Sequence, residues 1–164
     1  MTSDEDANVF EQGALWLADA TLELALTGDD RYAAVSPGPA FPAVLRTLAA
    51  AVSVIGRQPV IVDLGAGIGG AGAWLAERAG AELISVEPAE GSRIAAKRLF
   101  PQLDIRAGSA QASGLPEHVA DMVVALGVTS LLGELAGFLT EARSGRTPGA
   151  GNSVVGHLDS LCDG

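Results

Sequence analysis

The sequence "VIVDLGAGIGG", residues 60–70, joins an apolar run to a burst of glycines, and the alanine-rich "AGAWLAERAG" follows at 71–80. The run at 60–64 has the continuous apolar character of a short strand buried on both faces. Gly65 and Gly67 carry no Cβ atom, so the chain can bend sharply there and a ligand can lie against the backbone. We therefore expect a strand, a tight turn and then a helix, whose N-terminus offers free N–H groups and a partial positive charge.

The same alternation of strand, turn and helix continues along the chain. Apolar runs predict strands at 60–64, 82–87, 103–107, 120–126 and 152–158, and helical patterns predict helices at 69–79, 91–100 and 131–143. Because short links join these elements, we expect an α/β fold with a mostly parallel sheet wrapped by helices. In such a sheet a ligand lies beyond the carboxyl ends of the strands, where the winding direction reverses.

Two further helices are predicted before the first strand, at 5–27 and at 42–55. Gly28 is expected to end the first of them. The segment between them, "GDDRYAAVSPGPAFP" at 28–42, is rich in Gly and Pro and is expected to be a loop. The apolar positions that recur along the first helix are Val9, Leu15, Leu22 and Leu26.

Composition limits the classes of function. A chain of 164 residues with 48% apolar residues is long enough for one domain with a real core. Its net charge is −10 and its single lysine is Lys97. Nucleic-acid binding and adhesion to anionic membranes are therefore disfavoured, because both need clustered basic residues.

Neither a disulfide nor a membrane segment is expected. Cys162 is the one cysteine, so it can form no internal disulfide and no cysteine-built metal site. The acidic start "MTSDEDANVF" does not resemble a signal peptide, and the apolar stretch at 49–55 is too short to span a bilayer. We expect a soluble cytoplasmic protein.

Glu87 ends the second predicted strand, 22 residues after Gly65. A carboxylate at that place can accept hydrogen bonds from both hydroxyls of an adenosine ribose. The alternative is an ordinary solvated acid at the end of a strand. The spacing between Glu87 and the glycine turn favours the ribose role.

The glycine spacing fits two cofactors. Gly65, Gly67 and Gly70 have the spacing of a dinucleotide-binding turn, whereas Gly65, Gly67 and Gly69 have a tighter one. Asp63 favours the second, because a carboxylate there would oppose a pyrophosphate and attract an ammonium group. A nicotinamide-dependent oxidoreductase stays open as an alternative on the spacing alone.

Four motifs, in order, resemble the class I S-adenosylmethionine-dependent methyltransferases: "VDLGAGIGG", "ISVEP", "AGSAQASGLP" and "ADMVVALGVTSLL". The likeness covers roughly residues 40 to 160. It implies a Rossmann-like three-layer fold and S-adenosyl-L-methionine as the cofactor. We divide the chain accordingly into N-terminal helices at 1–58, which would cap the site, and a cofactor-binding core at 59–164, within one structural domain. The acidic composition favours a small-molecule acceptor.

The resemblance also implies roles for individual residues. Gly65, Ala66 and Gly67 would pass under the methionine and ribose parts of the cofactor, and Gly69 would let the next helix start close to the sheet. Asp63 would attract the methionine ammonium group. At the end of the fourth strand, Ala125 and Leu126 would face the methyl donor.

The other end of the cofactor is assigned in the same way. Glu87 would hold the ribose hydroxyls, and Pro88 would lie against the adenine. Ser109 and Ala110 match the place where many family members carry an acid that contacts the adenine amino group. Here that residue is Ser109, which is a weaker hydrogen-bond acceptor.

The sequence identifies no general base. His118 is expected to be a solvated loop residue, and His157, close to Asp159 on the fifth predicted strand, is a weak catalytic candidate. Among the aromatic residues, Tyr32 is a candidate to close over the cofactor. Trp74 is expected to be a packing residue. For Trp16, packing in the core is favoured over lining a substrate pocket.

The family's sheet normally continues past the fifth strand with a helix and an antiparallel hairpin, but this chain ends six residues after Leu158. We therefore expect the C-terminal hairpin to be missing. The strand at 152–158 would then be an open edge that invites a partner, such as a second copy in a homodimer. A catalytically silent methyltransferase-like module that needs a partner is the alternative to an active enzyme.

Overall fold

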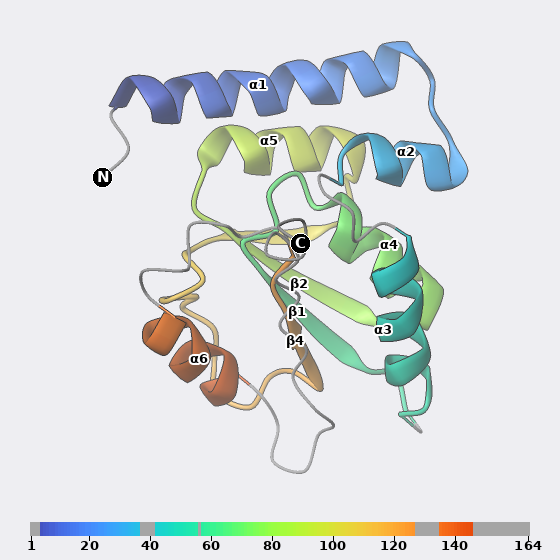
Figure 1. The fold of residues 1–164 in the computed structure, drawn as a ribbon, viewed down its shortest axis with the longest axis vertical. Coiled ribbons are helices and arrows are strands. Elements are labelled where there is room, and N and C mark those ends of the chain that lie inside the picture. Colours follow the sequence, from blue (N-terminus) through green and yellow to red (C-terminus); the bar gives the residue numbers. More distant parts are fainter. Residues whose placement is uncertain (1–3, 37–41, 56, 127–134, 146–164) are drawn as a thin grey trace, which may run out of the picture.

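The computed structural model describes residues 4–36, 42–55, 57–126 and 135–145. Within these residues, four strands form one parallel sheet in the order β3–β2–β1–β4 (Figure 1). The strands are β1 (Val60–Leu64), β2 (Glu82–Glu87), β3 (Asp104–Ala107) and β4 (Met122–Val124). The predicted α/β fold with a parallel sheet is thus confirmed.

The winding direction reverses beside β1. From β1 the chain moves outward through β2 to β3, and it then returns to place β4 on the other side of β1. The register pairs Asp63 of β1 with Ser85 of β2 and with Val124 of β4. Because all pairings are parallel, the carboxyl ends of the strands share one edge of the sheet, and the turn after β1 lies at the switch point.

Helices cover both faces of the sheet. They are α1 (Asp4–Glu23), α2 (Gly28–Ala34), α3 (Ala43–Ser53), α4 (Gly70–Ala79), α5 (Glu90–Leu99) and α6 (Leu135–Ser144). Alternate residues of β1 face opposite layers: Ile61 is buried in a cluster with α3 and α4, whereas Val62 packs in a cluster with Phe138 of α6. Helix α1 lies outside α5 and forms an additional outer layer (Figure 1).

The N-terminal segment differs from its prediction. Helix α1 ends at Glu23, and the predicted loop contains helix α2, so Gly28 begins a helix instead of ending one. The cause is tertiary contact, because the Asp29 carboxylate accepts hydrogen bonds from Trp74 Nε1 at 2.9 Å and from Arg78 at 2.7 Å, both on α4. These contacts hold a short helix that composition alone does not favour.

The predicted apolar stripe of α1 is also wrong in part. Val9 is 71% exposed and Leu22 is 47% exposed, whereas the small residues Ala14 and Ala18 are buried against α5. Trp16 is 71% exposed, so the expectation that it packs in the core is wrong.

Helices α1 and α5 approach each other closely, which explains why α1 buries its face of small residues. A Cβ atom on Gly91 of α5 would lie 2.7 Å from Cβ of Glu11 on α1. The distance between packed helices depends on the side chains at the contact, and only small ones allow so close an approach.

The remaining predicted elements agree with the described structure to within a few residues, although β4 is shorter than predicted. The first part of the helix predicted at 131–143 lies outside the described residues. The strand predicted at 152–158, and with it the proposed dimer edge, lies outside the described residues. The division into a cap at 1–58 and a core at 59–164 stays a prediction. Among the described helices, none has both the length and the apolar character needed to cross a membrane.

Candidate functional site

The glycine turn after β1 is held by the end of β2. The N–H groups of Gly65 and Ala66 both donate to the carbonyl of Val86, at 2.8 and 3.1 Å. Three glycines of the turn have positive φ, namely +77° at Gly65, +56° at Gly67 and +81° at Gly69. Residues with a Cβ atom rarely adopt these angles, so the bend requires glycine.

The glycines of the turn clear space for different neighbours. A Cβ atom on Gly67 would meet no atom within 4 Å, so the backbone there is open to a ligand. A Cβ on Gly69 would lie 2.6 Å from Leu103 Cδ2, and one on Gly70 would lie 2.7 Å from Ser36 Oγ. The space that Gly70 leaves is therefore taken by the end of α2, which the sequence did not predict.

Asp63 lies beneath the first turn of α4. Its side chain is 2% exposed, and Oδ1 accepts no hydrogen bond from any residue that the structure describes. A Cβ atom on Gly72 would lie 2.5 Å from Asp63 Oδ2, so Gly72 is the residue that admits this carboxyl group. Burial, with a smaller contribution from the negative charge of Glu87, raises the pKa of Asp63 from 3.8 to about 7. A buried carboxyl group that lacks a hydrogen-bond donor can accept hydrogen bonds from a cationic donor, such as an ammonium group.

Glu87 joins the glycine turn to the start of α5. Its Oε2 accepts a hydrogen bond from the Gly67 N–H at 2.8 Å, and its Oε1 accepts one from the Ala89 N–H at 2.9 Å. The residue is 6% exposed, which excludes the alternative of a solvated strand-end acid. Each oxygen keeps a further lone pair, so the carboxylate can still accept hydrogen bonds from a ligand.

Arg93 does not neutralise this carboxylate in the structure. Its guanidinium donates instead to the backbone carbonyls of Glu87 and Pro88, at 2.9 and 2.5 Å. Pro88 itself is exposed at the same edge of the sheet. Glu87 therefore keeps its acceptor capacity where β2 ends.

Ser109 forms a small turn after β3. It exchanges backbone hydrogen bonds with Ala112, both at 3.1 Å, and its Oγ accepts another from the Ala112 N–H at 3.1 Å. Ala110 is 4% exposed and packs in the core cluster that contains Phe138 and Ala142. Its side chain is thus turned to the core, and Ser109, which is half-buried, is the better candidate to contact a ligand.

Ala125 and Leu126 follow β4 at the carboxyl edge. Ala125 is 3% exposed, and Leu126 is half-buried against the cluster under α3 and α4. The parallel topology thus brings all the sequence-predicted site segments to one edge of the sheet. Among the predicted site residues, a side-chain hydrogen bond directly joins Gly67 to Glu87.

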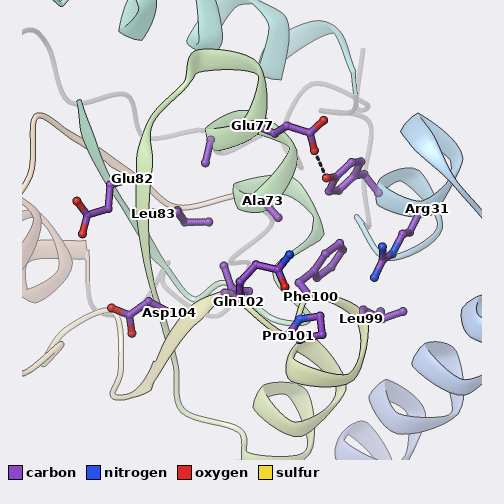
Figure 2. A pocket seen from close by; sticks show the side chains of 13 residues that line it. Arg31, Ala73, Glu77, Glu82, Leu83, Leu99, Phe100, Pro101, Gln102 and Asp104 are labelled. Atoms are coloured by element: carbon purple, nitrogen blue, oxygen red, sulfur yellow. Dashed lines mark hydrogen bonds between the residues drawn. The ribbon is translucent and has the colours of Figure 1, made fainter. Parts of the chain in front are cut away.

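A cavity lies at the opposite edge of the sheet. It measures about 480 Å³ and is lined by the first residues of β2 and β3, the end of α5, and parts of α2 and α4 (Figure 2). Ligands of parallel sheets bind at the carboxyl ends of the strands. This cavity at the amino ends is therefore not the predicted cofactor site.

Tyr32 belongs to this cavity and not to a cover over the glycine turn. Its hydroxyl donates to Glu77 Oε2, and its ring stacks on Phe100 with centroids 5.5 Å apart. Burial and the Glu77 carboxylate raise the pKa of Tyr32 to about 12. Its placement gives no support to the predicted lid role.

The other aromatic and histidine candidates are placed as follows. Trp74 is 3% exposed, which confirms its packing role, and it also binds Asp29. His118 is exposed in the loop before β4, as predicted. His157 and Asp159 lie outside the described residues.

The sequence did not indicate the role of Gly72, which depends on the carboxyl group of Asp63 in the neighbouring layer. Nor did it indicate the contacts that hold the loop after β3, which come from α6. No local pattern marks either feature, because each depends on packing between distant segments.

Comparison with known proteins gives a consistent result. The family model described as a methyltransferase domain matches residues 62–149, which is more than half of the chain. A candidate type II methyltransferase from Anaeromyxobacter dehalogenans is 29% identical, over 70% of this chain and 47% of that chain, with a TM-score of 0.56. DesVI of Streptomyces venezuelae is 20% identical, over 72% of this chain and 50% of that chain, with a TM-score of 0.59.

A third similar structure carries a ligand. It is an S-adenosylmethionine-dependent methyltransferase from Thiobacillus denitrificans in complex with S-adenosyl-L-homocysteine. The identity is 23%, over 70% of this chain and 46% of that chain, with a TM-score of 0.53. None of the curated proteins matches the chain. The chain spans about half the length of these three solved structures.

Proposed function

Because the chain belongs to the class I S-adenosylmethionine-dependent methyltransferases, we propose that it binds S-adenosyl-L-methionine at the glycine turn and methylates a small-molecule acceptor. The observation that carries this proposal is the pair of buried carboxyl groups, Asp63 and Glu87, that flank one open glycine turn. They offer acceptors for an ammonium group and for two hydroxyls within one short stretch of the sheet edge.

The residues present fit this cofactor. Asp63 Oδ1 lacks a hydrogen-bond donor among the described residues, and an ammonium group would supply one. Glu87, already fixed by two backbone N–H groups, would hold the ribose hydroxyls. The open face of Gly67 would let the cofactor lie against the backbone. Ser109 would face the adenine amino group, and Pro88 the adenine ring.

When bound, the cofactor supplies an electrophilic methyl group on a sulfonium centre. The chain's own residues would bind and orient the cofactor and the acceptor, and they would exclude water from the site. Alignment of the two reactants alone can lower the barrier to methyl transfer by about 7–11 kcal/mol. Among the described residues, none is placed as a general base. Such a base is needed only for a nucleophile that keeps its proton at neutral pH.

The electrostatics support a small acceptor. The chain has ten basic and twenty acidic residues, and the site itself is built around two carboxyl groups. These charges favour a cationic cofactor and disfavour a polyanionic acceptor. The acidic composition therefore supports a small molecule as acceptor, and the alternatives of O-, N- and C-methylation stay open.

Two alternatives make different predictions. A nicotinamide-dependent oxidoreductase would place a pyrophosphate over a turn that has the Asp63 carboxyl beneath it, and the space at Gly70 is taken by Ser36. These two features and the family argue against it. A catalytically silent module is favoured by one observation, the serine at position 109 in place of an acid.

Calorimetric titration tests the proposal. The chain should bind S-adenosylhomocysteine and should not bind NADH. Glu87→Gln should lower the affinity for S-adenosylhomocysteine at least about tenfold, which corresponds to about 1.4 kcal/mol of binding free energy. The reason is that an amide N–H of the glutamine would then face a backbone N–H donor. Glu82→Gln, at the other end of the same strand, is the matched control and should bind like the unmodified chain. Tight NADH binding without S-adenosylhomocysteine binding would overturn the proposal. Methyl transfer to candidate acceptors separates an enzyme from a silent module.

A further inference from the structure

Helix α6 holds the loop that follows β3. The Ser113 N–H donates to Glu141 Oε1 at 2.8 Å, and the Ser113 hydroxyl donates to the same oxygen. The Leu115 N–H in turn donates to Ser113 Oγ at 3.1 Å. Ser113 is 6% exposed, so little water competes for these bonds. A single carboxylate oxygen thus fixes the middle of the loop from 28 residues away.

A separate set of contacts holds the far end of the loop. The N–H groups of His118 and Ala120 donate to the carbonyls of Ser144 and Gly145, both at 2.8 Å. These bonds come from the backbone and do not involve Glu141. Replacing the Glu141 side chain should therefore release the near part of the loop while its far end stays attached.

One peptide group connects Glu141 to Ser109. The carbonyl of Ala112 accepts the Ser109 N–H at 3.1 Å, and the N–H on the other side of that same planar peptide group, that of Ser113, donates to Glu141. The orientation of the peptide plane is thus set by the carboxylate at one end and transmitted to Ser109 at the other. Hydrogen bonds in such a series also polarise and strengthen one another.

We propose that Glu141 is a positioning residue for the adenine end of the cofactor site, acting through the Ala112–Ser113 peptide group on Ser109. This inference rests on the proposed function, in which Ser109 meets the adenine amino group. Ser109 Oγ already accepts the Ala112 N–H, so one lone pair remains for that amino group. A hydroxyl oxygen held in this place can accept from the 6-amino group of adenine, whereas a purine with hydrogen at C6 has no such donor.

Selectivity between two nucleosides tests the inference. The probes are S-adenosylhomocysteine and its analogue with hydrogen in place of the 6-amino group, titrated calorimetrically into the unmodified chain and into Glu141→Ala, Glu141→Met and Glu141→Gln. The alanine and methionine variants should lose about tenfold in affinity for S-adenosylhomocysteine, and the ratio of their affinities for the two probes should approach one. The glutamine variant retains an acceptor oxygen and should keep the preference, with affinity within about threefold.

The controls separate positioning from a general loss of stability. Arg143→Ala changes an exposed residue of the same helix and should behave like the unmodified chain in both titrations. Thermal unfolding of each variant shows that it is folded, and Glu141→Met, which keeps the length of the side chain, replaces Glu141→Ala if the latter does not fold. Amide spectra should show shifts at Ser109 and Ala112 in Glu141→Met, before any ligand is added.

The titrations distinguish failure of the role proposed for Glu141 from failure of the proposed function. If the unmodified chain binds S-adenosylhomocysteine and the methionine variant binds both probes with unchanged affinity and preference, the role of Glu141 is refuted while the proposed function stands. If the unmodified chain binds neither probe, the proposed function itself is refuted, and the inference with it.

Discussion

Replacing the buried Asp63 by asparagine should stabilise the ligand-free chain above neutral pH. The folded state raises the pKa of this carboxyl from 3.8 to about 7, chiefly through burial. Between those values the folded chain holds a proton that the unfolded chain has released. The free energy of unfolding therefore falls as pH rises, by about 1.4 kcal/mol per pH unit and by about 4 kcal/mol in all, and it stays at that lower level above about pH 7.

The amide side chain of the Asp63→Asn variant has nearly the same shape as the carboxyl group and cannot ionise, so this loss disappears. Part of the gain is offset, because a buried amide without all its partners costs about 1–3 kcal/mol. We expect the variant to be more stable than the unmodified chain by about 1–3 kcal/mol at about pH 8. At about pH 4, where Asp63 is protonated in the folded chain, that advantage should be absent.

Urea unfolding at the two pH values measures this difference. Asp121→Asn is the contrasting control, since the buried Asp121 carboxylate accepts the Val60 N–H at 2.9 Å and pairs with Arg57. That variant should be less stable than the unmodified chain at about pH 8, because it loses partners that Asp63 does not have. An Asp63→Asn variant that is less stable than the unmodified chain at about pH 8, with an unchanged dependence on pH, would show that burial does not raise the pKa of Asp63 in this way.

Three further predictions concern the same edge of the sheet. Affinity for S-adenosylhomocysteine should rise with pH up to about pH 7 and then level off, because its ammonium group prefers ionised Asp63, and Asp63→Asn should abolish this dependence in calorimetric titrations. Gly72→Ala should destabilise the chain by about 1–3 kcal/mol in thermal unfolding, because the new Cβ atom would lie 2.5 Å from Asp63 Oδ2. The control Gly13→Ala, in a helix where the added Cβ meets nothing within 4 Å, should stabilise by about 0.5–1 kcal/mol. Gly67→Ala should lower the affinity for S-adenosylhomocysteine at least about tenfold, because it strains a residue with φ of +56° and puts a methyl group on the open face of the backbone. An unchanged affinity would show that the ligand does not lie on that face.

Much of the fold could be predicted because local patterns and topology agree around β1. The apolar run at 60–64 and the glycines after it predict the strand, the turn and the start of α4, and the structure has them where expected. Helix α2 could not be predicted, because Asp29 and Tyr32 stabilise it through α4. The buried face of α1 likewise depends on how closely α5 approaches.

The candidate site was predictable to a similar degree. Asp63 and Glu87 could be placed beside the turn, since parallel strands bring their carboxyl ends to one edge. The hydrogen bond from Gly67 to Glu87 agrees with that placement. The support that Glu141 gives to Ser113 could not be foreseen, because it joins a loop to a helix with no sequence pattern in common.

A crystal structure of the chain soaked with S-adenosylhomocysteine would test cofactor binding at the glycine turn without intermediate steps. We expect the ribose hydroxyls to donate to the Glu87 carboxylate and the ammonium group to lie at Asp63 Oδ1, over the open face of Gly67. A nucleoside found instead in the cavity beside Phe100, at the amino ends of β2 and β3, would contradict this expectation, as would crystals in which the glycine turn stays empty at saturating ligand.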